Sequence, residues 1–462
     1  MPTLPLPVLT ATLLVVALIP VLVPARTLWR RGGGSRGWAL MPDNLQENSD
    51  LRRPECRAGL HQYLRWKLAR GEARGHLEPG SGADHALALG HDDGRLRRGA
   101  LEEGMGPSPR WQSRVDHLSA DLNLRVGDCV WVRSVDEILS TLDQEGCLDS
   151  LPFMPEMVDY CGRKFRVAKR FDKYNDYVYQ TGLRRMKNAV LLEGVRCNGT
   201  SHGGCQALCQ IIWKEAWLTR VEKASPRPSP AARPGHVACS RDDLLRATRG
   251  ADSGDEPRFL CQATQAYKAS SRLRWWDMRQ YWRDLSSGNV GAPGLIRGFA
   301  FVLFSFVLRV GGYRLLVGLY NRVQRIRGAD PYPYCQGTLK RTPAREMNLT
   351  PGELVRVKSY DDILRTLDTN NKNRGLWFDA EMVKYCGGTY AALCRVETIV
   401  DNKSGRLIKP RNPCIVLEGV TNQGDYHGFS PRNEYLFWRE VWLERVPGGP
   451  GGDSSSKVLP RA

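Results

Sequence analysis

Several side chains that could bind a metal ion lie in one glycine-rich segment of the chain. The run C-N-G-T-S-H-G-G-C-Q-A-L-C supplies Cys197, His202, Cys205 and Cys209. Tetrahedral zinc takes thiolate and imidazole donors, and glycines in a loop let such donors converge without steric clash. A further thiol, Cys161, follows an expected helix or turn. The predicted zinc ligands are Cys161, Cys197 and Cys205, plus either His202 or Cys209.

Other roles for these cysteines stay open. An iron-sulfur cluster is less favoured, because the segment lacks the close C-x-x-C spacing that such clusters use. Buried cysteines also pack as small hydrophobic residues. The chain has thirteen cysteines, too few for a disulfide-dense scaffold, so reduced thiols are expected, whereas secretion would favour disulfides.

Catalytic motifs are scarce. No dinucleotide-binding glycine loop, phosphate-binding loop, H-E-x-x-H or G-x-S-x-G motif occurs in context. An acid-base pair could be built from His202 and Glu193 or Glu215, but carboxylates of this kind more often cap turns or pair with arginine. We therefore name no catalytic residue, and a metal-dependent enzyme that uses the Cys/His loop remains an alternative.

Tryptophans close to cations raise a second alternative. Trp213 and Trp217 lie beside Lys214 and Arg220, and aromatic side chains interleaved with cations can stack on bases and hold phosphates. The same tryptophans serve equally well as core residues. Because no recognised motif supports it, nucleic-acid binding is possible but not favoured.

The module that contains these residues occurs twice in the chain. Residues 122–221 and 347–446 align without a net gap at a shift of 225 positions, which matches His202 to His427 and Cys161 to Cys386. Three of the candidate ligands are not kept in the second copy: Cys197, Cys205 and Cys209 correspond to Asn422, Ser430 and Glu434. Gene duplication explains the repeat, and an intact metal site is expected only in the first copy.

The pattern within each copy is mainly β. VGDCVWVRS and PGELVRVKS alternate apolar and polar residues after a glycine turn, which predicts a half-buried strand. VDEILSTLD and YDDILRTLD have the spacing of a short helix with an acidic first turn. KFRVAKRF, AVLLEGV and the Trp-rich end predict further strands. We expect two small, strongly bent β-barrels like the SH3-type barrels, a fold that does not fix function.

The second copy resembles a group of uncharacterised bacterial proteins. The phrases PGELVRVKS, NNKNRGLWFDAEMVKYCGGTY, PCIVLEGV and FWREVWLERV carry the resemblance, which covers about residues 120–446. It implies a shared Cys/Cys/His/Cys set with cysteines at the positions of Asn422 and Ser430. It therefore favours His202 over Cys209 as a ligand and makes the second copy degenerate. The resemblance implies no activity.

Two apolar segments bear on the membrane. Residues 4–25 carry no charge and precede Arg26, which favours a retained transmembrane helix with the bulk of the chain in the cytoplasm. A cleaved signal or an upstream extension is the alternative, because four prolines interrupt the run. Residues 294–328 are apolar and flanked by arginine, as in a helix lying in the membrane interface or a buried helical hairpin.

The predicted organisation follows from these features. It comprises an N-terminal anchor or signal (1–31), a mostly disordered Arg/Gly-rich region (32–115), the first module (116–222), a Pro-rich linker with an aromatic amphipathic helix (223–292), an apolar helical segment (293–328), the second module (340–447) and a disordered tail (448–462).

Composition and organisation together lead to one functional expectation. The net charge of +18 favours anionic neighbours such as phospholipid, nucleic acid or acidic glycan. We expect a membrane-associated, non-enzymatic scaffold that binds a protein partner, with zinc in its first module. The sequence does not indicate an oligomeric state.

Overall fold

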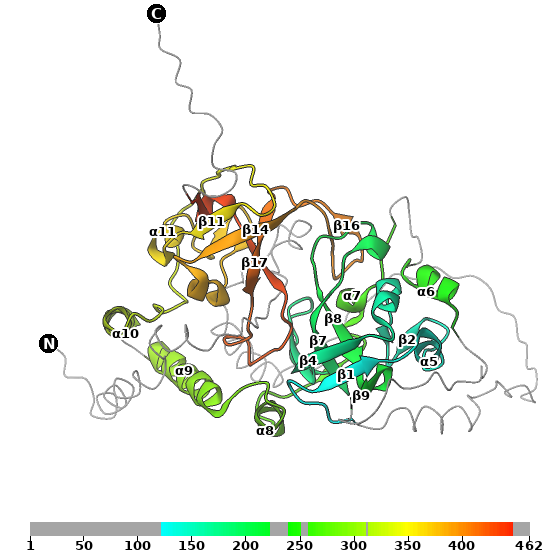
Figure 1. Ribbon diagram of the computed structural model, residues 1–462. Coiled ribbons are helices and arrows are strands. Elements are labelled where there is room, and N and C mark those ends of the chain that lie inside the picture. Colours follow the sequence, from blue (N-terminus) through cyan, green and yellow to red (C-terminus); the bar gives the residue numbers. More distant parts are fainter. Residues whose placement is uncertain (1–121, 222–238, 251–256, 311–312, 447–462) are drawn as a thin grey trace, which may run out of the picture.

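The computed structural model describes residues 122–221, 239–250, 257–310 and 313–446. Within these ranges the protein is mainly β, with short helices, as expected (Figure 1). The predicted N-terminal segment, the Arg/Gly-rich region, the Pro-rich stretch and the C-terminal tail lie outside the described residues.

The first module is built on a five-stranded antiparallel sheet. Its order is β8 (Gln210–Lys214), β7 (Ala189–Arg196), β4 (Lys164–Arg170), β1 (Cys129–Val132) and β9 (Leu218–Arg220). Alternation in the sequence V-W-V explains β1, where Val130 and Val132 are buried and Trp131 is partly exposed. Register shifts in the pairing of β7 with both of its neighbours bend the sheet.

The second module repeats this sheet strand for strand. Its order is β18 (Tyr435–Trp438), β17 (Cys414–Thr421), β14 (Thr389–Val396), β11 (Leu354–Val357) and β19 (Leu443–Arg445). The pairing of β17 with both of its neighbours also shifts in register. The two copies therefore share one topology.

Short helices cross the ends of each sheet. In the first module these are α5 (Val135–Leu139), η3 (Pro155–Tyr160), η4 (Thr200–His202) and η5 (Glu215–Trp217); in the second they are α11 (Tyr360–Leu364), η6 (Ala380–Tyr385) and η7 (Glu440–Trp442). Ser134 caps α5 and Ser359 caps α11, each by accepting a backbone N–H of the first turn. The capping serines thus fix where these helices begin.

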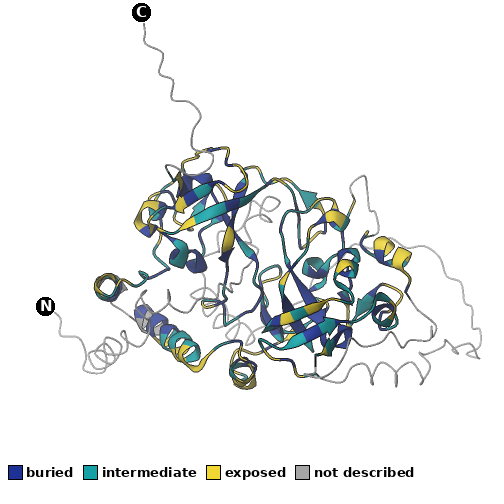
Figure 2. Ribbon diagram, in the orientation of Figure 1, coloured by how far each residue is buried: buried dark blue, intermediate teal, exposed yellow. Residues whose placement is uncertain are grey.

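Tryptophans form the core of each module. Trp213 and Trp217 are fully buried and meet edge to face at 6.5 Å, and the Trp217 ring donates to Thr141 Oγ1 at 3.1 Å. Figure 2 shows that buried residues are frequent along the strands of both sheets. Trp442 repeats the bond to Thr366 at 2.9 Å. These indole rings are core residues and are not available to stack on bases.

Small β-hairpins project from the two sheets. The first module carries β2 (Cys147–Leu148) with β3 (Leu151–Pro152), and β5 (Lys173–Asp176) with β6 (Gly182–Arg185), to which β10 (Ser271–Arg272) adds a third strand. The second module carries β12 (Lys372–Asn373) with β13 (Leu376–Trp377), and β15 (Ile399–Val400) with β16 (Leu407–Ile408). The β5–β6 and β15–β16 hairpins occupy matching places in the two copies.

The segment between the modules is helical. It contains α6 (Arg241–Ala247), α7 (Gln262–Gln265), α8 (Arg279–Ser286), α9 (Ala292–Val310) and α10 (Tyr313–Ile326). The expected aromatic helix is α8, on which Trp282 is 71% exposed. A buried ion pair of 2.5 Å between Asp284 and Lys173 fixes α8 to the first module.

The predictions of a transmembrane helix, and of membrane association through such a helix, are wrong for the part of the chain described. No helix there is both long enough and apolar enough to cross a bilayer. In α9 the apolar residues divide between two faces: Phe304 is buried and stacks on Tyr320 of α10 at 5.1 Å, whereas Ile296, Phe299 and Leu303 are exposed. The buried face supports the packing of α9 against α10 within residues 294–328. The apolar residues 4–25 are outside the described ranges.

Candidate metal centre

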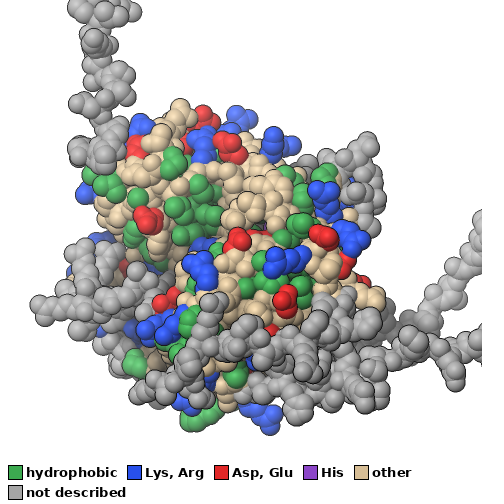
Figure 3. All heavy atoms as spheres, turned by 45° about the vertical axis from the view of Figure 1, so that its right-hand side comes forward, with side chains coloured by type: hydrophobic (Ala, Val, Ile, Leu, Met, Phe, Trp, Pro, Cys, Tyr) green, Lys and Arg blue, Asp and Glu red, His purple; other side chains and the backbone are tan. Residues whose placement is uncertain are grey.

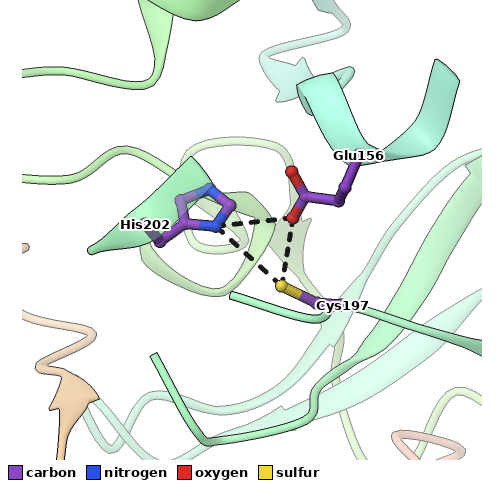
Figure 4. A group of neighbouring side chains, drawn as sticks. All are labelled: Glu156, Cys197 and His202. Atoms are coloured by element: carbon purple, nitrogen blue, oxygen red, sulfur yellow. Dashed lines mark hydrogen bonds and ion pairs between the residues drawn. The ribbon is translucent and has the colours of Figure 1, made fainter. Parts of the chain in front are cut away.

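Three elements of the first module converge on one buried cluster. Glu156 comes from η3, Cys197 follows the end of β7, and His202 lies on η4. A backbone hydrogen bond of 2.8 Å from Cys197 N to Cys209 O closes the base of the loop between them. Figure 4 shows the three side chains pointing toward one another from these elements.

The three donor atoms form a compact triangle. Cys197 Sγ lies 3.1 Å from Glu156 Oε1 and 3.9 Å from His202 Nδ1, and the imidazole and carboxylate atoms are 3.4 Å apart. A tetrahedral zinc ion at its usual bond lengths would set its ligands about 3.3 to 3.6 Å apart. The cluster is thus close to the size needed for an ion to bind with small side-chain movements.

Burial controls the protonation of this cluster. The His202 and Glu156 side chains are only 1% and 3% exposed. Burial lowers the pKa of His202, although the Glu156 charge and the backbone of Leu260 oppose it. Burial, and then the Glu156 charge, raise the pKa of the Cys197 thiol. Without an ion the cluster therefore holds a neutral imidazole and a protonated thiol near neutral pH.

Glycines make the tight loop possible. Gly199 has a φ of 72°, and a Cβ atom there would lie 1.9 Å from the carbonyl oxygen of Cys205. The Gly199 N–H also donates to Cys197 Sγ at 3.3 Å, a contact that would stabilise a thiolate. The residue type at this position thus fixes both the backbone path and the surroundings of the sulfur.

The structure brings together only part of the predicted ligand set. Cys197 and His202 lie in the cluster. Cys205 and Cys209 line the same small cavity but stand outside the triangle, and Cys261, from the segment between the modules, lines it too. The Cys205 sulfur accepts the N–H of Val400 at 3.3 Å and so faces the second module.

Cys161 and the disulfide alternative are also placed by the structure. Cys161 is not among the residues that line the cavity, and its sulfur contacts Met157 O at 3.8 Å. Every cysteine in the described ranges is a free thiol. The described cysteines are therefore separate thiols, and Cys197 is the one that belongs to the triangle.

Glu156 is the ligand candidate that the sequence did not single out. It is identical in the two copies, where Glu381 is its counterpart, and both side chains are buried. Burying a carboxylate is costly unless its charge is neutralised. Its identity in the two copies, rather than any spacing motif, is the sequence signal that could have drawn attention to it.

The second copy fills the matching position differently. Lys384 Nζ pairs with Glu381 Oε2 at 2.9 Å, and Asn422 Oδ1 accepts the N–H of Gly424 at 2.7 Å. His427 turns to Asp379 at 3.1 Å. A lysine ammonium thus neutralises the buried carboxylate here, and the loop is held by hydrogen bonds.

No protein-family model, curated protein or solved structure matches this chain. The resemblance to uncharacterised bacterial proteins therefore stays an expectation and brings no activity with it. The chemistry of the cluster rests on its own residues: a carboxylate, a thiol and an imidazole, which could hold a metal ion.

Proposed function

We propose that the protein is a non-enzymatic, partner-binding scaffold of two SH3-like modules, the first of which is stabilised by a zinc ion on Glu156, Cys197 and His202. The strongly bent five-stranded sheets, with register shifts in the central pairs, support the SH3-like interpretation. The duplication of the module supports a binding role, because two linked copies of one binding surface raise the apparent affinity for a partner.

One observation carries the metal proposal: the charge balance at the buried glutamate differs between the copies. Glu381 has the Lys384 ammonium beside it. The residue of the first copy that corresponds to Lys384 is Asp159, and among the described ion pairs Glu156 is joined only to His202. A buried carboxylate next to a neutral imidazole needs a cation, and a bound metal would supply it.

The donor set favours zinc over other ions. Thiolate, imidazole and carboxylate are all ligands that zinc accepts, whereas calcium and magnesium prefer oxygen donors alone. Three protein ligands leave one coordination position. Structural zinc sites have four protein ligands, so a neighbouring cysteine of the cavity, Cys205 or Cys209, would complete it.

The surroundings favour a structural ion over a catalytic one. His202 is 1% exposed, and the Glu156 carboxylate lies between the two other ligands. Catalytic zinc keeps an open position that substrate can reach.

On the face shown in Figure 3, Lys and Arg are interspersed with Asp and Glu, which lends nucleic-acid binding no support there.

Metal analysis of matched variants tests the proposal. We expect about one zinc per purified full-length chain, by the ligand count of such sites. Cys197→Ser and His202→Gln should each lose it, whereas His427→Gln, the matched change in the second copy, should keep it. Absence of zinc from the wild type, or equal zinc in all four proteins, would refute the site.

A further inference from the structure

The loop that carries the metal cluster also docks on the second module. Gln206 N donates to Thr398 O at 2.9 Å, and Gln206 Oε1 accepts from Thr398 N at 3.0 Å. The neighbouring Cys205 sulfur accepts from Val400 N. Loop 197–209 is therefore seated against the β15–β16 hairpin, which Figure 1 shows reaching toward the first module.

The second module returns the same contact. Asn175 N, on β5, donates to Ser430 Oγ at 3.0 Å. Ser430 corresponds to Cys205 and Asn175 to Val400 at the shift that relates the copies. The Arg432 guanidinium also lies over the ring of Tyr174 at 5.5 Å. Each module thus places its loop on the other's hairpin, in a pseudo-twofold pair.

The two reciprocal contacts form the joint between the modules. The loop that makes each contact is attached to its own module in a different way. In the second module, Glu381 accepts the backbone N–H groups of Gln423 at 3.0 Å and of Tyr426 at 2.9 Å, so the loop is tied directly to η6. In the first module, Glu156 reaches the loop through the side chains of Cys197 and His202. A bound ion would therefore connect the Glu156 carboxylate on η3 to the Cys197 and His202 side chains on the loop.

We infer that metal occupancy at Glu156, Cys197 and His202 controls how firmly loop 197–209 holds the β15–β16 hairpin, and so regulates one of the two reciprocal contacts between the modules. This inference rests on the proposed zinc site. The ion links η3 to the loop, and the loop presents Cys205 and Gln206 to the second module. Loss of the ion loosens loop 197–209 and its contact with the β15–β16 hairpin. Loop 422–434 is held by hydrogen bonds and keeps its contact with the β5–β6 hairpin.

Hydrogen exchange of the full chain, with zinc and after removal of zinc by a chelator, tests the inference. Amides of 397–408 should exchange about tenfold faster without zinc, because local opening sets their protection. Amides of the β5–β6 hairpin, residues 173–185, form the internal control and should change little. An equal rise in both hairpins would overturn the inference, since the ion would then stabilise the whole fold.

A second variant distinguishes the effect of zinc on the loop from its effect on the stability of the whole fold. Asp159→Lys with Cys197→Asn copies Lys384 and Asn422 into the first module, where the lysine should neutralise Glu156. We expect this protein to bind no zinc and to protect 397–408 equally with and without chelator. Fast exchange there in both conditions would count against the inference.

The two proposals fail in different ways. Zinc bound to the wild type, with exchange of 397–408 unchanged on its removal, overturns the regulatory inference and leaves the zinc site standing. A wild type without zinc overturns both.

Discussion

Each module contains an ion pair between an arginine and a buried glutamate. Arg170 pairs with Glu215 at 2.7 Å, with both side chains almost fully buried, and Glu215 Oε1 also accepts the N–H of Leu124 at 3.0 Å. Arg395 and Glu440 repeat the pair at 3.0 Å, but Arg395 is 23% exposed. The same residues thus sit in different dielectric surroundings in the two copies.

Removal of one partner should reveal this difference. We expect Arg170→Ala to lower the free energy of unfolding by about 3 kcal/mol, because it leaves the buried Glu215 charge uncompensated. Arg395→Ala should cost less, since water reaches that site. Urea unfolding of the two variants measures this, and equal losses would contradict the burial argument.

The protonation of Cys197 predicts how zinc binding depends on pH. Its thiol pKa is raised by burial and by the Glu156 charge, so the ion must displace a proton from sulfur. The pKa of His202 is lowered, so the imidazole is already neutral and releases none near pH 7. Zinc affinity should therefore rise about tenfold per pH unit between pH 6 and 8. Competition with a chromogenic chelator measures it; affinity independent of pH would contradict a thiolate ligand.

At the scale of elements, two glycines of nearly equal φ make different demands. Gly199 and Gly194 have φ values of 72° and 71°, but only at Gly199 would a Cβ atom meet backbone, whereas nothing lies within 4 Å of one at Gly194. A side chain would therefore strain the backbone at both positions, but it would overlap with neighbouring atoms only at Gly199.

Alanine at these positions separates the two effects. We expect Gly194→Ala to cost about 1 kcal/mol of unfolding free energy, from the left-handed conformation alone. Gly199→Ala should cost more and also abolish zinc binding, because the loop must shift away from Cys205. Urea unfolding with metal analysis checks both, and retention of zinc by Gly199→Ala would show that the loop tolerates the shift.

Most elements of the modules could be predicted from local pattern. The segment KFRVAKRF forms β4, AVLLEGV begins β7, and VDEILSTLD contains α5, because alternation and helical spacing report which face of an element is buried. The 3-10 turns at the sheet ends were not predicted in detail. Their conformation depends on the sheet they cross, as for Glu215, which accepts N–H groups from Asn123 and Leu124 far away in the chain.

At the scale of the whole molecule, the two modules form an internal pair rather than two independent units. Reciprocal contacts through Cys205 and Val400, and through Ser430 and Asn175, join them. The segment between them contributes as well, since Phe259 N donates to Gly405 O at 2.7 Å. These contacts together fix how the two modules are placed relative to one another.

Local patterns along the chain were enough to predict the duplication, the mainly β class and the loop that supplies Cys197 and His202, because repeats, periodicity and ligand chemistry are all local properties. The folded chain was needed to show that Glu156 completes the triangle, that Cys161 lies apart and that Cys205 contacts the second module. The physical reason is that η3 and the loop meet through the folding of the sheet between them. Spacing along the chain carries no information about that distance.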